Sequence, residues 1–104
     1  MSMLTYYGTF MGDVYAERHR QNKKWGTVED NFVLRNPSTW LSILVEEVGE
    51  VAQSILEEEG LRDELVQVAA VAAAWVEAID RGGPTVDAAY MGKGNSVEVQ
   101  QSGQ

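Results

Sequence analysis

Eight of the sixteen acidic residues of this chain lie within one stretch of nineteen residues, where only Arg62 offsets their charge. They are Glu46, Glu47, Glu50, Glu57, Glu58, Glu59, Asp63 and Glu64. Carboxylate oxygens are the ligands that Mg²⁺ prefers, and carboxyl groups also act as acids and bases in hydrolysis. Two interpretations are open: a solvated acidic surface that performs no chemistry, or a group of carboxylates that converge on a cation.

Two pairs of residues at i, i+3 spacing favour convergence. Glu47 and Glu50 share one side of a predicted helix, and Glu64 and Gln67 lie beside the apolar face of the next helix, which includes Trp75. An ionised carboxylate beside an apolar face is costly unless it is paired, hydrogen-bonded or bound to a metal. If the two helices form a hairpin, the pairs can face each other, and a divalent cation such as Mg²⁺ would offset their repulsion.

A basic cluster precedes the acidic stretch, with Arg18, Arg20, Lys23 and Lys24 inside seven residues. The net charge of −8 argues against binding of a nucleic-acid polymer, which requires a basic face. The cluster could instead hold an anion next to a cation, or it could be a solvated helix face. Phosphate oxygens are the anions that such groups would bind, from Arg18, Arg20 or Lys24. Trp25 could stack on a nucleobase and Gln21 could contact its edge, although both are equally suited to packing.

Apolar residues at helical spacing predict three helices. The first carries residues from Met3 to Trp25 on one face and is ended by Gly26, and residues 27–36 are predicted to form a loop. The second begins near Pro37, capped by Asn36 or Ser38, and runs to Glu59, where Gly60 ends it. The third begins near Leu61 and stops at residues 82–84.

The predicted fold is an all-α helical bundle built on an αα-hairpin, with a helical domain over residues 1–84. Residues 85–104 are rich in Gly, Ser, Gln and Asn, which predicts a tail that is poorly ordered or docks on a neighbour. Three helices give a thin core, so we expect a homodimer or homotetramer to complete a four-helix bundle. The second helix carries an apolar stripe and places Trp40 and Ile43 on its glutamate side; the stripe is Leu41, Leu44, Val45, Val48, Ala52, Ile55 and Leu56.

The chain has no cysteine, no basic segment followed by an apolar one at its start, and no apolar run long enough to span a bilayer. These features predict a cytoplasmic protein that has neither disulfides nor thiolate metal sites and does not enter a membrane.

The order of three sequence blocks indicates a family. The block "ERHRQNKKWG" covers residues 17–26, and "EEVGE" at residues 46–50 is followed, after thirteen residues, by Glu64-x-x-Gln67 within "LRDELVQVAAVAAAWVEAI". Over roughly residues 10–82 these blocks resemble the MazG-like superfamily of all-α nucleoside triphosphate pyrophosphohydrolases, in particular its phage-type and bacterial subgroup. The glutamates are similar to the EExxE…ExxD signature of that superfamily.

The resemblance implies house-cleaning hydrolysis of (deoxy)nucleoside triphosphates to monophosphate and pyrophosphate with Mg²⁺, for which Mn²⁺ could substitute. It implies that Glu47, Glu50, Glu64 and position 67 hold the metal, with Glu46 as a supporting residue. Glu50, and with it Glu47, is the expected catalytic carboxylate that positions the attacking water.

Gln67 departs from the signature, which has Asp at this position. A glutamine carbonyl is a neutral ligand, so metal binding should be weaker or rearranged. Two alternatives to the enzyme therefore stay open: a catalytically weak relative that binds metal and nucleotide, and an acidic helical bundle that binds proteins.

Overall fold

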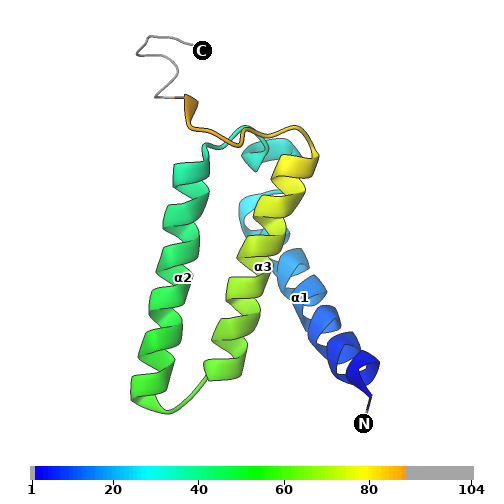
Figure 1. Cartoon of the computed structure of the whole chain (residues 1–104), viewed down its shortest axis with the longest axis vertical. Helices are drawn as coiled ribbons and strands as arrows, with labels where there is room; N and C mark the ends of the chain where they lie inside the picture. The colour runs from blue at the N-terminus through cyan, green and yellow to red at the C-terminus, as the bar shows by residue number, and fades with distance from the viewer. Residues whose placement is uncertain (1, 89–104) are drawn as a thin grey trace.

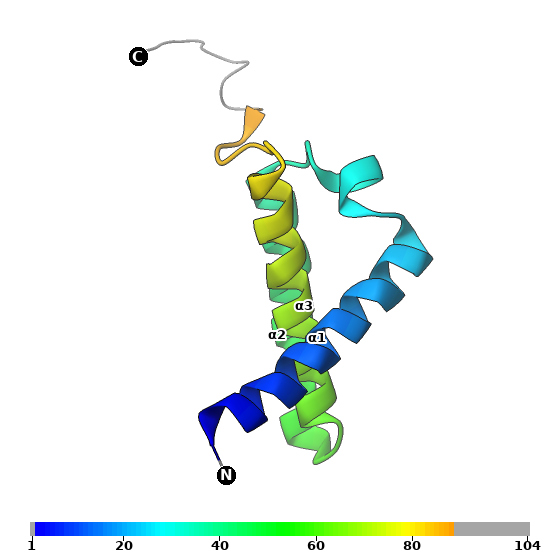
Figure 2. The same cartoon turned by 90° about the vertical axis from the view of Figure 1, so that its right-hand side faces the viewer.

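The computed structural model describes residues 2–88, apart from the side chains of residues 30 and 31. This part of the chain is helical and contains no strand, as predicted. Its elements are α1 (Met3–Trp25), the π-helical turn η1 (Val28–Phe32), α2 (Pro37–Glu57) and α3 (Leu61–Asp80). Figure 1 shows α2 and α3 side by side as an antiparallel hairpin, and Figure 2 shows α1 crossing α3 obliquely. Both α1 and α2 pack on α3, which is therefore the central helix.

The helix boundaries differ from the predicted ones at two places. Within the predicted loop, residues 28–32 form a π-helical turn, because Val28 is buried against α2 and α3. At the hairpin, α2 ends at Glu57 rather than Glu59: Glu58 adopts a left-handed conformation with φ of 60°, and Gly60, with φ of 78°, starts α3. Leucine or valine would be strained at Gly60, whereas glycine adopts positive φ readily.

The first turn of α2 is capped by a residue that is distant in sequence. Asn36 is the N-cap residue, but its side chain does not bond the first turn of the helix. Instead the backbone N–H of Ser38 donates to Oδ1 of Asp87 at 2.9 Å, and the backbone N–H of Ala88 donates to Oδ1 of Asn36 at 3.2 Å. The first residues of the predicted tail therefore dock on α2, and the rest of it, residues 89–104, lies outside the described residues.

Two small clusters hold the helices together. One joins α1 to α3 and contains Val14, Val66 and Ala70. The other joins η1, α2 and α3 and contains Val28, Trp40, Ala74 and Ala78. Alanines at three of these seven positions let the helices approach α3 closely. Next to the second cluster, Gly83 leaves no room for a side chain, since an added Cβ would lie 2.2 Å from the carbonyl oxygen of Val33.

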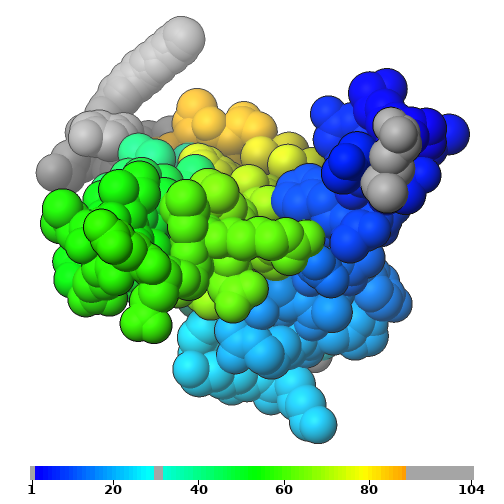
Figure 3. All heavy atoms as spheres, turned by 90° about the horizontal axis from the view of Figure 1, so that it is seen from below, coloured from blue at the N-terminus to red at the C-terminus, as the bar shows by residue number. Residues whose placement is uncertain are grey.

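Most of the predicted apolar stripe of α2 is exposed. Trp40 lies on the glutamate side of α2, as predicted, where it is buried and packs on Ala74 and Ala78 of α3. Five of the seven stripe residues are more than half exposed: Leu41, Val45, Val48, Ile55 and Leu56. The N-terminal turns of α1 also stand away from the hairpin (Figure 3) and expose Met3, Leu4, Tyr6, Tyr7 and Met11. Among the described residues, no helix combines the length and apolarity that a bilayer span requires.

Candidate functional site

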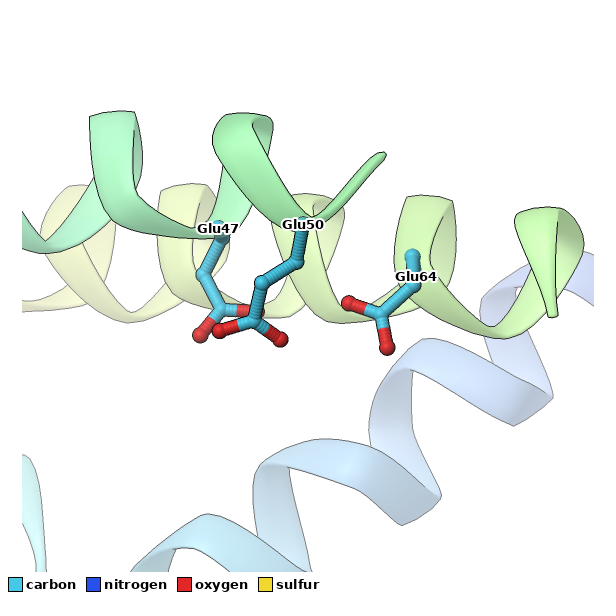
Figure 4. A group of neighbouring side chains, drawn as sticks. All are labelled: Glu47, Glu50 and Glu64. Atoms are coloured by element: carbon cyan, nitrogen blue, oxygen red, sulfur yellow. The ribbon is translucent and has the colours of Figure 1, made fainter. Parts of the chain in front are cut away.

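Three glutamates from the two helices of the hairpin converge. Glu47 and Glu50 come from α2 and Glu64 from α3, and Figure 4 shows their side chains pointing to the same side of the hairpin. One carboxylate oxygen from each residue lies within 4.8 Å of the others. The i, i+3 spacing on α2 and the short turn at residues 58–60 produce this arrangement, because the turn returns α3 antiparallel to α2. The predicted convergence of these three residues is therefore present.

The cluster is electrostatically unfavourable without a cation. Glu47 and Glu64 are half-buried, and Oε1 of Glu47 and Oε2 of Glu64 are buried with no hydrogen-bond partner among the described residues. Burial is the main cause that raises the pKa of Glu47, followed by the charges of Glu50 and Glu64. Burial also raises the pKa of Glu64, and the neighbouring Glu50 adds to the effect, because a protonated Glu64 can donate to its carboxylate.

The donor atoms fit a hard divalent cation. Mg²⁺ and Mn²⁺ take carboxylate and carbonyl oxygens as ligands, and the two buried, unpartnered oxygens need either a proton or a cation. Gln67 is half-buried next to the cluster and its side chain makes no hydrogen bond within the described part of the chain, so its amide oxygen could join the carboxylates. Glu46 is exposed and lies outside the group of three.

The acidic cluster opens into a cleft of about 620 Å³. The cleft lies between the C-terminal half of α1 and the first four turns of α2, and residues of α3 also line it. Glu46, Glu47 and Glu50 line one end, with Arg20 close enough to interact with the charge of Glu47. Phe32, Arg35 and Trp40 line the other end. The lining residues are Arg18, Arg20, Gln21, Asn22, Lys24, Trp25, Phe32, Arg35, Trp40, Ile43, Glu46, Glu47, Glu50, Gln67, Val71 and Ala74. A cleft of this size and mixed lining is typical of a small-molecule site.

The predicted phosphate-binding residues all line the cleft but differ in their partners. The Arg18 guanidinium is half-buried and donates to Oε1 of Gln21, Oδ1 of Asn22 and Oε1 of Glu77, at 3.1, 3.0 and 3.4 Å. The bond to Glu77 joins α1 to α3, and the three bonds together hold the Arg18 guanidinium in the wall of the cleft. Gln21, predicted to contact a base, is buried and serves as one of its acceptors.

The other predicted residues are more accessible. Arg20 forms a bidentate ion pair with Glu17 and is half exposed. The Lys24 ammonium stands 4.8 Å from the centre of the Trp25 ring, and Trp25 itself is 53% exposed at the mouth of the cleft. A side chain so exposed is not part of the core, which leaves it accessible for stacking.

Sequence reasoning missed the aromatic end of the cleft. Phe32 and Trp40 lie edge to face with ring centres 6.1 Å apart, and Trp40 stacks on Trp75 at 6.4 Å. Arg35 places its guanidinium over the Phe32 ring, with Cζ 4.1 Å from the ring centre. The only sequence signal for Arg35 is a single cation between two aromatic residues in a segment predicted to be a loop.

The fold and the site together define an all-α hairpin protein with a three-carboxylate cluster at one end of a cleft and aromatic and basic groups at the other. No protein-family model, curated protein or solved structure gives a significant match to the chain.

Proposed function

We propose that this chain is a divergent member of the MazG-like superfamily that hydrolyses (deoxy)nucleoside triphosphates to monophosphate and pyrophosphate with Mg²⁺ or Mn²⁺. One observation carries the proposal: Glu47, Glu50 and Glu64 converge at the end of a cleft whose other end is aromatic and basic. A nucleoside triphosphate needs both ends, since its phosphates bind cations and its base binds aromatic surfaces. The sequence blocks that resemble the family supply the carboxylates of the cluster.

The proposed metal ligands are Glu47, Glu50 and Glu64, with the amide oxygen of Gln67 as a neutral fourth donor. A bound divalent cation would neutralise phosphate charge and lower the pKa of a bound water. Glu50 is the exposed member of the cluster, so its carboxylate is the one placed to orient a water and accept its proton, with Glu47 beside it.

The proposed contacts to the rest of the substrate follow from accessibility. Arg20 and Lys24 can reach phosphate oxygens from the wall formed by α1, and Trp25 can stack on part of the nucleotide at the mouth of the cleft. Arg18 supports that wall through its bonds to Gln21 and α3. We propose that Arg18 and Gln21 act on the substrate indirectly, by holding this wall in position.

Gln67 supports a second candidate, a relative that binds metal and nucleotide but turns over slowly. Replacing the family's Asp by a neutral amide removes one negative charge from the ligand set, so the cation is held less tightly. A protein that senses or sequesters a nucleotide needs to bind the metal and the nucleotide but does not need to hydrolyse the nucleotide quickly.

We also propose that the chain works as a homodimer or homotetramer. Nine apolar residues of α2 and α3, here called the back face, are between 38% and 78% exposed: Leu41, Val45, Val48, Ile55, Leu56, Leu61, Leu65, Val76 and Ile79. Applied to ordinary residue areas, these fractions give about 800 Å², which exceeds the usual largest apolar patch of a monomer and equals one side of a standard interface. A second hairpin packed there would complete a four-helix bundle.

Pyrophosphate release from a panel of nucleoside triphosphates tests the proposal. The assay compares the wild type, Glu50→Ala and Gln67→Asp with Mg²⁺ or Mn²⁺, and Glu59→Ala, an exposed glutamate at the end of the hairpin, is the matched control. We expect metal-dependent turnover that Glu50→Ala abolishes and Glu59→Ala leaves unchanged. Turnover only in Gln67→Asp would identify the slow relative, and neither turnover nor binding of metal or nucleotide would leave the acidic protein-binding bundle.

A further inference from the structure

Arg35 differs from the other arginines of the cleft, because its guanidinium donates no hydrogen bond within the described part of the chain. Within the described part of the chain its side chain makes no hydrogen bond or ion pair, only contacts with the rings of Phe32 and Trp40, at 4.1 and 5.8 Å from Cζ. The other arginines of the cleft, Arg18 and Arg20, are bonded to carboxylates.

The stacking on Phe32 leaves those donors available. The N–H groups of a guanidinium lie in its plane, so an aromatic ring that covers one face blocks none of them and restricts the motion of the side chain. Arg35 is half-buried beside Trp40, which is itself buried, so its hydrogen bonds to a ligand would form in a partly desolvated setting. A rigid, planar fork of donors suits an acceptor that presents two atoms in one plane.

The position of Arg35 indicates which part of a nucleotide it meets. Trp40, at the Arg35 end, and Glu47, in the acidic cluster, are seven residues apart on α2, which corresponds to about 10 Å along the helix. A triphosphate held at the carboxylates would extend its nucleoside along the cleft towards Trp40. In that arrangement Arg35 would meet the edge of the base rather than the phosphates.

We propose that Arg35 makes this site selective for 6-oxopurines, the bases guanine and hypoxanthine. Their O6 and N7 are two coplanar acceptors at the spacing of a guanidinium fork, which is the pairing that arginine makes with guanine in nucleic acids. On the corresponding edge adenine presents an amino donor beside N7, uracil presents a single acceptor, O4, and cytosine presents an amino donor. This inference rests on the proposed function, since it assumes that the acidic end of the cleft holds the phosphates.

The test is kcat/KM for GTP, dGTP, ITP, ATP, CTP and UTP in the wild type, Arg35→Gln and Arg35→Lys. Lys23→Gln, which removes one exposed cation outside the cleft lining, is the matched control. We expect the wild type to prefer GTP, dGTP and ITP. Arg35→Gln should lower kcat/KM for these three by about 5- to 150-fold, which corresponds to the 1–3 kcal/mol of a bidentate base contact, and should favour ATP, because glutamine pairs with N6 and N7 of adenine. Arg35→Lys keeps the charge but loses the fork, so it should lose selectivity as well.

An equal loss for all six nucleotides in Arg35→Gln would overturn the inference, because it would indicate a phosphate contact or damaged folding. A wild-type preference for ATP, CTP or UTP would overturn it also. If the wild type turns over none of the nucleotides, the proposed activity fails, and binding of fluorescent GTP and ATP analogues with Mg²⁺ then tests Arg35 by itself. Tighter binding of the GTP analogue that Arg35→Gln removes would support the inference, and equal or absent binding would reject it.

Discussion

Replacing Glu64 by glutamine should stabilise the metal-free protein and abolish its stabilisation by metal. Glu64 lies within 4.8 Å of both Glu47 and Glu50, so the substitution removes two of the three like-charge pairs of the cluster. At 4.8 Å two unit charges repel by about 3.5 kcal/mol at an effective dielectric of 20 and by about 0.9 kcal/mol in bulk water.

The lower figure is the appropriate one, because Glu50 is exposed and water screens its charge. Two pairs then give a gain of about 1–2 kcal/mol in the free energy of unfolding. The glutamine amide is also a donor, so it can bond a neighbouring carboxylate that has no partner now.

Urea unfolding at pH 7.5 and fixed protein concentration, with EDTA or with excess Mg²⁺ or Mn²⁺, measures both effects. The wild type should gain about 2.7 kcal/mol at a metal concentration a hundred times the Kd, and Glu64→Gln should gain little. Glu59→Gln removes the same charge from an exposed site and should change neither quantity by more than about 0.5 kcal/mol. If Glu64→Gln is less stable than the wild type in EDTA, or keeps the full stabilisation by metal, the interpretation of the cluster is wrong.

Four further predictions follow from the same structure. Without metal, the free energy of unfolding should fall as pH rises from about 4.3 through the raised pKa values of Glu47 and Glu64. The reason is that the folded state binds more protons in this range than the unfolded state. Saturating Mg²⁺ should remove this loss of stability, which urea titrations from pH 4.5 to 8 would measure. Gln67→Asp should tighten Mn²⁺ binding about tenfold or more, measured by calorimetry, since it restores a charged ligand. Val48→Glu should lower the molar mass measured by light scattering if the back face is an interface. Gly83→Ala should cost more than about 2 kcal/mol in thermal unfolding, because its Cβ would collide with a backbone carbonyl.

Periodicity predicted the helices and the convergence of the carboxylates well, because both depend on local spacing. The positions of Glu47, Glu50 and Glu64 on their helices, together with a tight turn, suffice to bring them together. The end of α2 was predicted two residues late, at Glu59. The sequence favours a left-handed residue only at Gly60, whereas Glu58 also adopts this conformation.

Long-range contacts explain what the sequence did not predict. Trp40 lies on the glutamate side of α2, as predicted, but its full burial was not predicted, because it depends on Val28 and Phe32 of η1, which pack on it. Arg35 enters the cleft through the same segment, whose path depends on tertiary packing. Arg18 lines the cleft, as expected of a residue that faces an anion, and its bonds to Gln21 and Glu77, which the sequence did not predict, also join α1 to α3.

Two unfavourable features of the single chain lie on different sides of α2. One side carries the repelling carboxylates together with the buried Trp40, and another exposes apolar residues of the back face. A cation would relieve the first feature, and another apolar surface would relieve the second. Because the carboxylates and the back-face residues occupy different faces of α2, we expect the two stabilisation energies to add. Metal and assembly would then each stabilise the hairpin that positions Glu47, Glu50 and Glu64, without either depending on the other for its contacts.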